Sequence, residues 1–185
     1  MKLIPYERVR ETVGKKSILA MKKRNCAALF HFFGEALAKT LRERLAESDK
    51  RAERILVTYL PRSAKGVNVY GFDQSRLLAK QVARELSADF ACVFKRKRVF
   101  FSQEQKHLSA SERRENMKSA FCLSQKDTFS LAQYDLVVIV DDVITTGASL
   151  AGCISLLDKE QRGKVVCLTV GATPRQKKNK IELHF

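Results

Sequence analysis

The sequence predicts an α/β fold in which an open, mainly parallel sheet is flanked by helices and a small helical hood lies at the N-terminus. Residues 136–140 form an apolar run without polar alternation, which is typical of a strand buried on both faces. Segments of strand and helix character alternate through the rest of the chain, and this order favours βαβ units. From 17 to 46 the chain has no proline and spaces its apolar residues at helical intervals.

The elements follow from local patterns. The N-terminal helix is predicted to cover the sheet and not to contribute a strand, so residues 1–50 are assigned to the hood and 51–185 to one compact core unit. The first strand is expected at 54–60, where Pro61 ends it, and Asp73 caps a helix over 73–87. The other predicted elements are a strand at 90–95, a basic stretch at 97–117 that becomes helical from 109, the strand at 136–140, a helix at 148–160, a strand at 164–170 and a mobile tail at 174–180.

The chemistry is concentrated after the apolar run. Two adjacent carboxylates, Asp141 and Asp142, stand there, followed by a small, hydroxyl-rich turn from Thr145 to Ser149. Ligands of parallel sheets lie beyond the carboxyl ends of the strands, where carboxylates can accept hydrogen bonds from a vicinal diol and favour a nearby cation. The turn can direct N–H groups and hydroxyls at an anion, and Gly147 suits a close approach or an otherwise costly φ. The pattern predicts a sugar-phosphate site; an ordinary turn whose Asp and Thr residues cap the helix is the alternative.

The composition favours a phosphate-bearing partner. Lys and Arg number 35 against 20 Asp and Glu, a net charge of +15, and the excess is spread over 1–65, 94–118 and 159–180. Such a field attracts the phosphates of a small metabolite or of nucleic acid, although a solvated basic surface also explains it.

Other classes are disfavoured. The five cysteines form no C-x-x-C pair, so no structural metal is expected, and Cys153 and Cys167 are predicted to be core side chains. No apolar run approaches the roughly 20 residues that cross a bilayer. The N-terminus lacks a secretory signal, so we expect no membrane span and a cytoplasmic location.

The segment from Val140 to Ser149 resembles the phosphoribosyl pyrophosphate (PRPP) motif of the type I phosphoribosyltransferases, in which a hydrophobic strand precedes two acidic residues and Thr-Thr-Gly. The resemblance implies the type I phosphoribosyltransferase fold, with Asp141 and Asp142 as the catalytic pair that holds the ribose hydroxyls and Mg²⁺ carried by PRPP. The substrate-binding residues that it implies on this segment are Val140, Thr145, Thr146, Gly147, Ala148 and Ser149.

Two further segments resemble the competence protein F (ComF) branch of the phosphoribosyltransferase-like proteins. Residues 60–65, LPRSAK, and 70–74, YGFDQ, resemble its proline-containing loop and Arg-Gly-Phe-Asn-Gln motif. Those two stretches form the first segment. The second segment, residues 102–121, matches a Thr-x-x-Gln-x-x-Leu … Arg … Asn … Ala-Phe pattern of the same branch, through Ser102, Gln105, Leu108, Arg113, Asn116, Ala120 and Phe121. The resemblance implies that Pro61, Arg62, Ser63 and Lys65 meet the pyrophosphate and that Arg98, Gln105 and Arg113 belong to a flexible loop that closes over the site. Taken alone, these residues also suit a solvated surface loop, and the amides of Gln105 and Asn116 suit a structural role.

The chain departs from the family pattern in three places. It lacks the four-cysteine zinc finger that precedes the core in many members, and it has Tyr70 and Asp73 where arginine and asparagine are usual. Losing a cation and gaining a carboxylate beside a pyrophosphate site should weaken the binding of the leaving group, so these departures concern catalysis more than the binding of the ribose 5-phosphate.

The resemblance implies a PRPP-binding phosphoribosyltransferase-like protein that transfers phosphoribose to an unidentified nitrogen acceptor and releases pyrophosphate. The alternative is a non-catalytic phosphate-binding protein that acts on single-stranded DNA in competence, with Tyr70, Phe72, Phe100 and Phe101 as aromatic candidates for base stacking. A PRPP or nucleotide sensor is a third reading, without a recognisable helix-turn-helix to accompany it. PRPP or another sugar phosphate is the expected ligand, and a homodimer stays open because type I members often dimerise.

Overall fold

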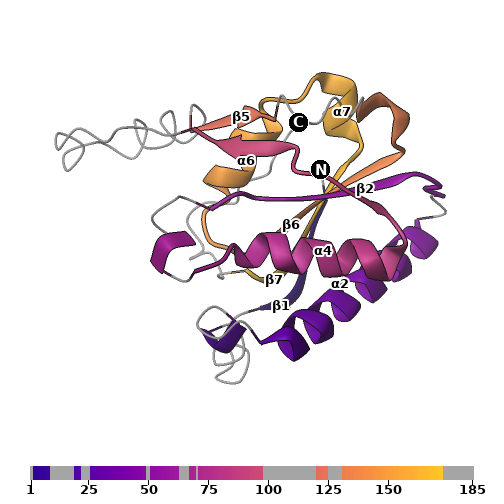
Figure 1. Cartoon of the computed structure of the whole chain (residues 1–185). Helices are drawn as coiled ribbons and strands as arrows, with labels where there is room; N and C mark the ends of the chain where they lie inside the picture. Colours follow the sequence, from indigo (N-terminus) through magenta and orange to yellow (C-terminus); the bar gives the residue numbers. More distant parts are fainter. Residues whose placement is uncertain are drawn as a thin grey trace.

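The computed structural model describes residues 2–8, of which only the backbone, and residues 19–21, 26–48, 51–62, 67–69, 71–97, 120–124 and 131–172. Five parallel strands form one sheet in the order β1-β7-β6-β2-β3 (Figure 1). These strands are β1 (Lys2–Arg8), β2 (Ile55–Tyr59), β3 (Asp89–Phe90), β6 (Leu136–Ile144) and β7 (Val165–Ala172). The short strands β4 (Phe94–Arg96) and β5 (Phe121–Leu123) pair antiparallel in a second sheet.

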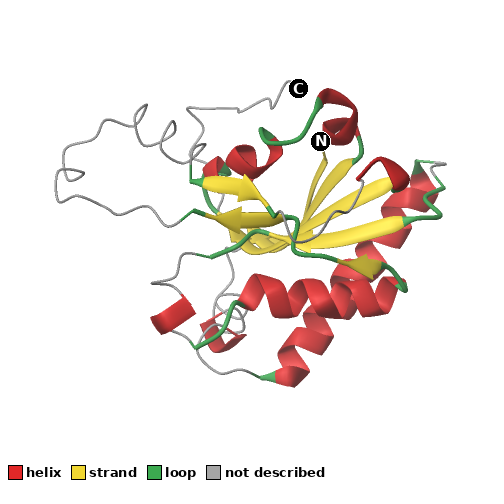
Figure 2. Ribbon diagram, turned by 45° about the horizontal axis from the view of Figure 1, so that its top comes forward, coloured by secondary structure: helices red, strands yellow, loops and turns green. Residues whose placement is uncertain are grey.

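Helices cover both faces of the parallel sheet (Figure 2). The long helices α2 (Ala27–Glu47) and α4 (Gln74–Leu86) pack side by side on one face, and α6 (Ala148–Ile154) and α7 (Lys159–Gly163) lie toward the other (Figure 1). A 3₁₀ turn at Leu131–Gln133 precedes β6. The predicted α/β class, with a parallel sheet flanked by helices and a helix near the N-terminus, is confirmed.

The central strand β6 is buried on both faces, as its apolar run predicts. Val138 and Val140 pack into the cluster under α2 and α4, whereas Val137 and Ile139 pack into the cluster under α6 and the β4–β5 pair. This alternation is the period of two that a strand imposes on its side chains. The core of the protein is therefore the sheet itself, clad on two sides.

Helix α2 is one of the helices that cover the sheet. Its buried face includes Phe33 and Leu37, which share one hydrophobic cluster with Leu78 and Val82 of α4. The two helices approach closely at Gly34, where a side chain would collide with Gln81. No helix in the described part of the chain is long and apolar enough to cross a membrane.

Three elements differ from the sequence prediction. β1 was not expected, because Pro5 and its charged neighbours do not look like a strand. Among the strands that the structure describes it pairs with β7 alone, and such an edge position tolerates proline. The strand expected at 90–95 is divided: β3 joins the main sheet beside β2, and β4 leaves to pair with β5. The helix expected at 148–160 is interrupted after Ile154, and α7 starts anew at a capping box formed by Asp158 and Gln161.

The end of β6 also differs. The apolar run was expected to stop before the carboxylates, but the strand continues to Ile144, and Asp141 is in register with Thr169 of β7. On its other side Val140 is in register with Tyr59, the last residue of β2. The loop after β2 therefore leaves the sheet beside the acidic pair.

Candidate functional site

A cleft lies at the carboxyl end of β6. Its volume is about 80 Å³, several times the space that one water molecule needs. It is lined by Leu60, Asp141, Val143, Ile144, Thr145, Thr146, Gly147, Ala148, Ser149 and Leu150. The turn that the sequence predicts as a phosphate cradle thus lines a cleft together with Asp141.

The turn of the cleft depends on Gly147, which precedes α6 as its N-cap residue. The φ of Gly147 is 74°, in the left-handed region, whereas a Cβ added there would have no heavy atom within 4 Å. The backbone conformation and not a collision is therefore what favours glycine here. The hydroxyl of Thr146 accepts a hydrogen bond from the N–H of Ala148 at 3.3 Å, which holds the turn closed from within.

Asp141 is anchored through one of its two carboxylate oxygens. Its Oδ1 accepts hydrogen bonds from the Ser75 hydroxyl and from the backbone N–H of Asp142, both at 2.9 Å. Because Asp141 also lines the cleft and is only half-buried, its second oxygen is the one available to a ligand.

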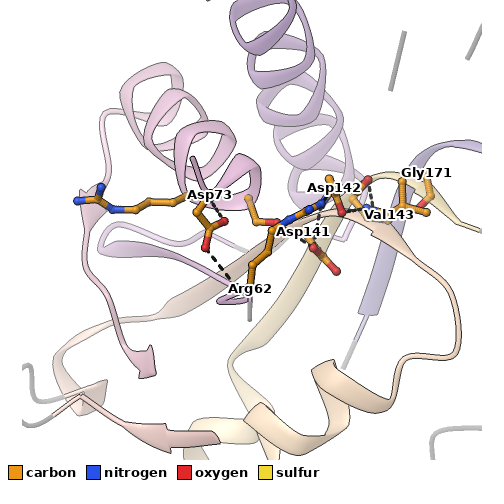
Figure 3. A network of polar contacts seen from close by, with 9 residues as sticks. Arg62, Asp73, Asp141, Asp142, Val143 and Gly171 are labelled. Atoms are coloured by element: carbon orange, nitrogen blue, oxygen red, sulfur yellow. Dashed lines mark hydrogen bonds and ion pairs between the residues drawn. The ribbon is translucent and has the colours of Figure 1, made fainter. Parts of the chain in front are cut away.

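Asp142 is in a different position from its neighbour. It is only 4% exposed, and it does not belong to the cleft lining. Its Oδ2 forms an ion pair with the guanidinium of Arg62, and its Oδ1 accepts the N–H of Val143 at 2.6 Å (Figure 3). Both oxygens of Asp142 are therefore engaged within the protein.

The pKa of Asp141 is raised to about 7. Burial disfavours its charged form most, the neighbouring Asp142 carboxylate adds repulsion, and the hydrogen bond from Ser75 opposes both effects. Near neutral pH the cleft thus contains a carboxyl group that changes charge easily. The buried thiols of Cys153 and Cys167, whose pKa values burial also raises, are core side chains as predicted.

The loop after β2 is tied to α4 by Asp73. Asp73 Oδ2 accepts the backbone N–H of Arg62 and its Oδ1 accepts that of Arg76, both at 3.2 Å. The predicted N-cap is confirmed. The pKa of the Asp73 carboxyl is raised, because the effect of burial exceeds the opposing effect of the backbone hydrogen bonds. An asparagine has one carbonyl oxygen for these two donors, so the carboxylate at this position has a structural use.

The structure places the other predicted residues as follows. Val140 is buried in the sheet beneath the cleft, and its carbonyl accepts the N–H of Leu60 at 3.1 Å. Pro61 is half-buried in the same loop. Phe72, a candidate for base stacking, packs edge-on against Phe30 of α2 with ring centroids 6.2 Å apart. The remaining predicted positions lie outside the described residues: Ser63, Lys65, Arg98, Gln105, Arg113, Asn116, Tyr70, Phe100 and Phe101.

Two buried hydroxyls at the site were not singled out from the sequence. Ser75 lies in the first turn of α4, where serine usually suggests capping, and Thr169 lies within β7. The Thr169 hydroxyl is within hydrogen-bonding distance of the carbonyls of Asp142, at 3.1 Å, and Gly171, at 2.9 Å. A lone polar residue inside the apolar strand at 164–170 was the signal that could have indicated Thr169.

The residues present fit a magnesium ion that arrives with its ligand. In the described part of the chain, no group of three or more His, Cys, Asp or Glu side chains could hold a metal ion by itself. Mg²⁺ commonly takes one or two carboxylates together with water and substrate phosphates. Asp141 can supply such a carboxylate from the cleft wall, whereas Asp142 already binds Arg62.

Comparison with known proteins identifies a relative. No family model matches the chain. Competence protein F of Haemophilus influenzae is 36% identical over 129 residues, which cover 65% of this chain and 55% of that protein. The chain therefore spans about half the length of the curated relative that it matches. This identity supports a relationship of the chain to the competence protein F (ComF) family, which the motifs described under Sequence analysis also resemble.

Proposed function

We propose that this protein binds PRPP, with the 5-phosphate against the turn 145–149 and the ribose over Asp141. The observation that carries the proposal is the cleft itself, which is lined by both a carboxylate and a small turn at the carboxyl end of the central strand. The carboxylate suits a sugar diol, and the turn suits an anion. The net charge of +15 favours a ligand with several phosphates.

The loop after β2 supports a place for the diphosphate. Arg62 lies beside the acidic pair, in the loop that follows β2, and its backbone N–H donates a hydrogen bond to Asp73 (Figure 3). A guanidinium is suited to bidentate contacts with phosphate oxygens. Mg²⁺ bound to the diphosphate would supply further charge neutralisation.

We extend the proposal to phosphoribosyl transfer. The lone pair of an acceptor nitrogen would form a bond to C1 of the ribose while the bond from C1 to the diphosphate oxygen breaks. The diphosphate leaves with the bonding electrons, and the proton of the acceptor nitrogen passes to solvent. Charge development at C1 favours a fixed carboxylate below the ring, which is where Asp141 would lie.

Titration calorimetry with PRPP and Mg²⁺ tests the binding. We expect saturable binding by the wild-type protein and at least a roughly tenfold loss in the Asp141→Asn, Asp142→Asn double variant, because hydrogen bonds from the ribose hydroxyls to a carboxylate are lost. Lys159→Glu, an exposed charge reversal on α7, is the control and should bind normally. Unchanged affinity in the double variant would refute the assigned site.

A second candidate function is binding of single-stranded DNA. The name of the relative associates that protein with competence, and α4 exposes Arg76, Lys80 and Arg84 at intervals of four residues, so that one face of the helix is basic. Such a row can contact successive phosphates of a flexible strand.

Gel retardation with a single-stranded oligonucleotide tests this candidate. We expect retardation that weakens steeply with salt and that is reduced by Arg84→Glu much more than by Lys159→Glu, since both reversals change the net charge equally. Absence of retardation at low ionic strength would contradict the candidate, and so would equal effects of the two reversals.

A further inference from the structure

The buried hydroxyl of Ser75 links α4 to the acidic pair. Ser75 is fully buried in the first turn of α4, and its Oγ lies 2.9 Å from Asp141 Oδ1, 66 residues further along the chain. Serine hydroxyls inside helices commonly bond to the carbonyl one turn back. Here the hydroxyl is directed across to the end of β6 instead, where it donates to a carboxylate.

This bond determines which oxygen of Asp141 is left for a ligand. Both the Ser75 hydroxyl and the N–H of Asp142 donate to Oδ1, so the carboxylate is held at one oxygen from two directions. The other oxygen is the one that can face the cleft. Without the hydroxyl, one of the two hydrogen bonds to Oδ1 is lost, and the carboxylate can rotate.

The second carboxylate cannot take over this role in the arrangement described. Asp142 lies outside the cleft lining, and its oxygens bind Arg62 and the N–H of Val143 (Figure 3). The two adjacent carboxylates therefore do different work: Asp142 anchors the loop after β2, and Asp141 faces the ligand.

We propose that Ser75 is a positioning residue for ribose recognition: by holding Asp141 Oδ1, it directs the other oxygen of Asp141 to the hydroxyls of a ribose 5-phosphate group. The inference deepens the proposed function and rests on it. Its distinctive consequence concerns the sugar and not the phosphate, because the phosphate turn at 145–149 has no described contact with Ser75.

The test compares ribose 5-phosphate with 2-deoxyribose 5-phosphate by titration calorimetry. The wild-type protein should bind ribose 5-phosphate the more tightly, by roughly tenfold, because one hydrogen bond to a charged group distinguishes the two. In Ser75→Ala this preference should fall to about twofold or less, while the affinity for 2-deoxyribose 5-phosphate stays near the wild-type value. If Ser75 had only a structural role, its substitution would lower the affinity for both sugar phosphates alike.

Ser75→Thr and Ser75→Val form the matched pair if the alanine variant does not fold. They have nearly equal volume and differ in the hydroxyl, so only the threonine variant should keep the preference for the ribose compound. An unchanged preference in Ser75→Ala, or equal preferences in the threonine and valine variants, would overturn the role of Ser75. Failure of the wild-type protein to bind either compound would instead overturn the proposed function on which that role rests.

Discussion

Replacing Arg62 with alanine should lower the free energy of unfolding by roughly 2–4 kcal/mol, because it leaves the carboxylate of Asp142 buried without its cation. The Asp142 side chain is 6% exposed and that of Arg62 is 20% exposed, so water replaces the guanidinium poorly. Urea unfolding at pH 8 measures the change.

The control for Arg62→Ala is Arg44→Ala. Arg44 pairs with Glu47 at 3.1 Å on the surface of α2, where both side chains are more than half exposed, and the loss should stay within about 0.5 kcal/mol. Adding Asp142→Asn to Arg62→Ala should restore part of the stability, since the buried charge is then absent. Equal effects of the two arginine substitutions, or no recovery in the double variant, would contradict the assignment of Asp142 as the anchored carboxylate.

Replacing Asp141 with asparagine should make the protein more stable at pH 8 and leave it nearly unchanged at pH 4. The pKa of Asp141 in the folded protein is about 7, above its usual value of 3.8. Between these values the folded protein keeps a proton that the unfolded chain releases, so wild-type stability falls as the pH rises from about 4 to about 7. Asparagine removes this dependence and can still accept the Ser75 hydroxyl through its own Oδ1.

The gain at pH 8 should be on the order of 1–3 kcal/mol, since each unit of pKa shift corresponds to about 1.4 kcal/mol and the cleft admits water. Unfolding by urea across pH 4–8, with wild type and Asp141→Asn side by side, measures it. Asp141→Asn should also lose PRPP affinity, which would be a trade of stability for function at one residue. Parallel pH profiles for the two proteins would show that Asp141 is not the group with the raised pKa.

Much of the fold could be predicted because its signals are local. The residues that indicate each element are close together in the sequence, as in the apolar run of β6, the helical spacing of α2 and the Asp73 cap. All three elements were predicted, but α2 begins at Ala27, after the extended N-cap residue Cys26, and not at residue 17. An edge strand such as β1 is harder to predict from the sequence, because its pairing with β7, and not its own composition, makes it a strand. The division of the 90–95 segment depends on the distant strand β5, which no local pattern reveals.

The residues of the site could be predicted from the sequence, but the different surroundings of its two carboxylates could not. The residues of the turn and the acidic pair follow in order along the chain, so their common location was predictable. The unequal surroundings of Asp141 and Asp142 were missed because β6 was expected to end before them. Within a strand, neighbouring side chains point to opposite faces, and this alternation brings one carboxylate to the cleft and the other to Arg62.

The central claim is that the cleft at the end of β6 holds the 5-phosphate of PRPP. Phosphorus NMR of PRPP titrated with the protein and Mg²⁺ tests it most directly, because the 5-phosphate and the diphosphate give separate resonances. We expect a saturable change of the 5-phosphate resonance with the wild-type protein, and its loss when Gly147, whose φ is 74°, is replaced by valine. A 5-phosphate resonance that does not respond to the wild-type protein, or that responds equally to the Gly147→Val variant, would contradict the account.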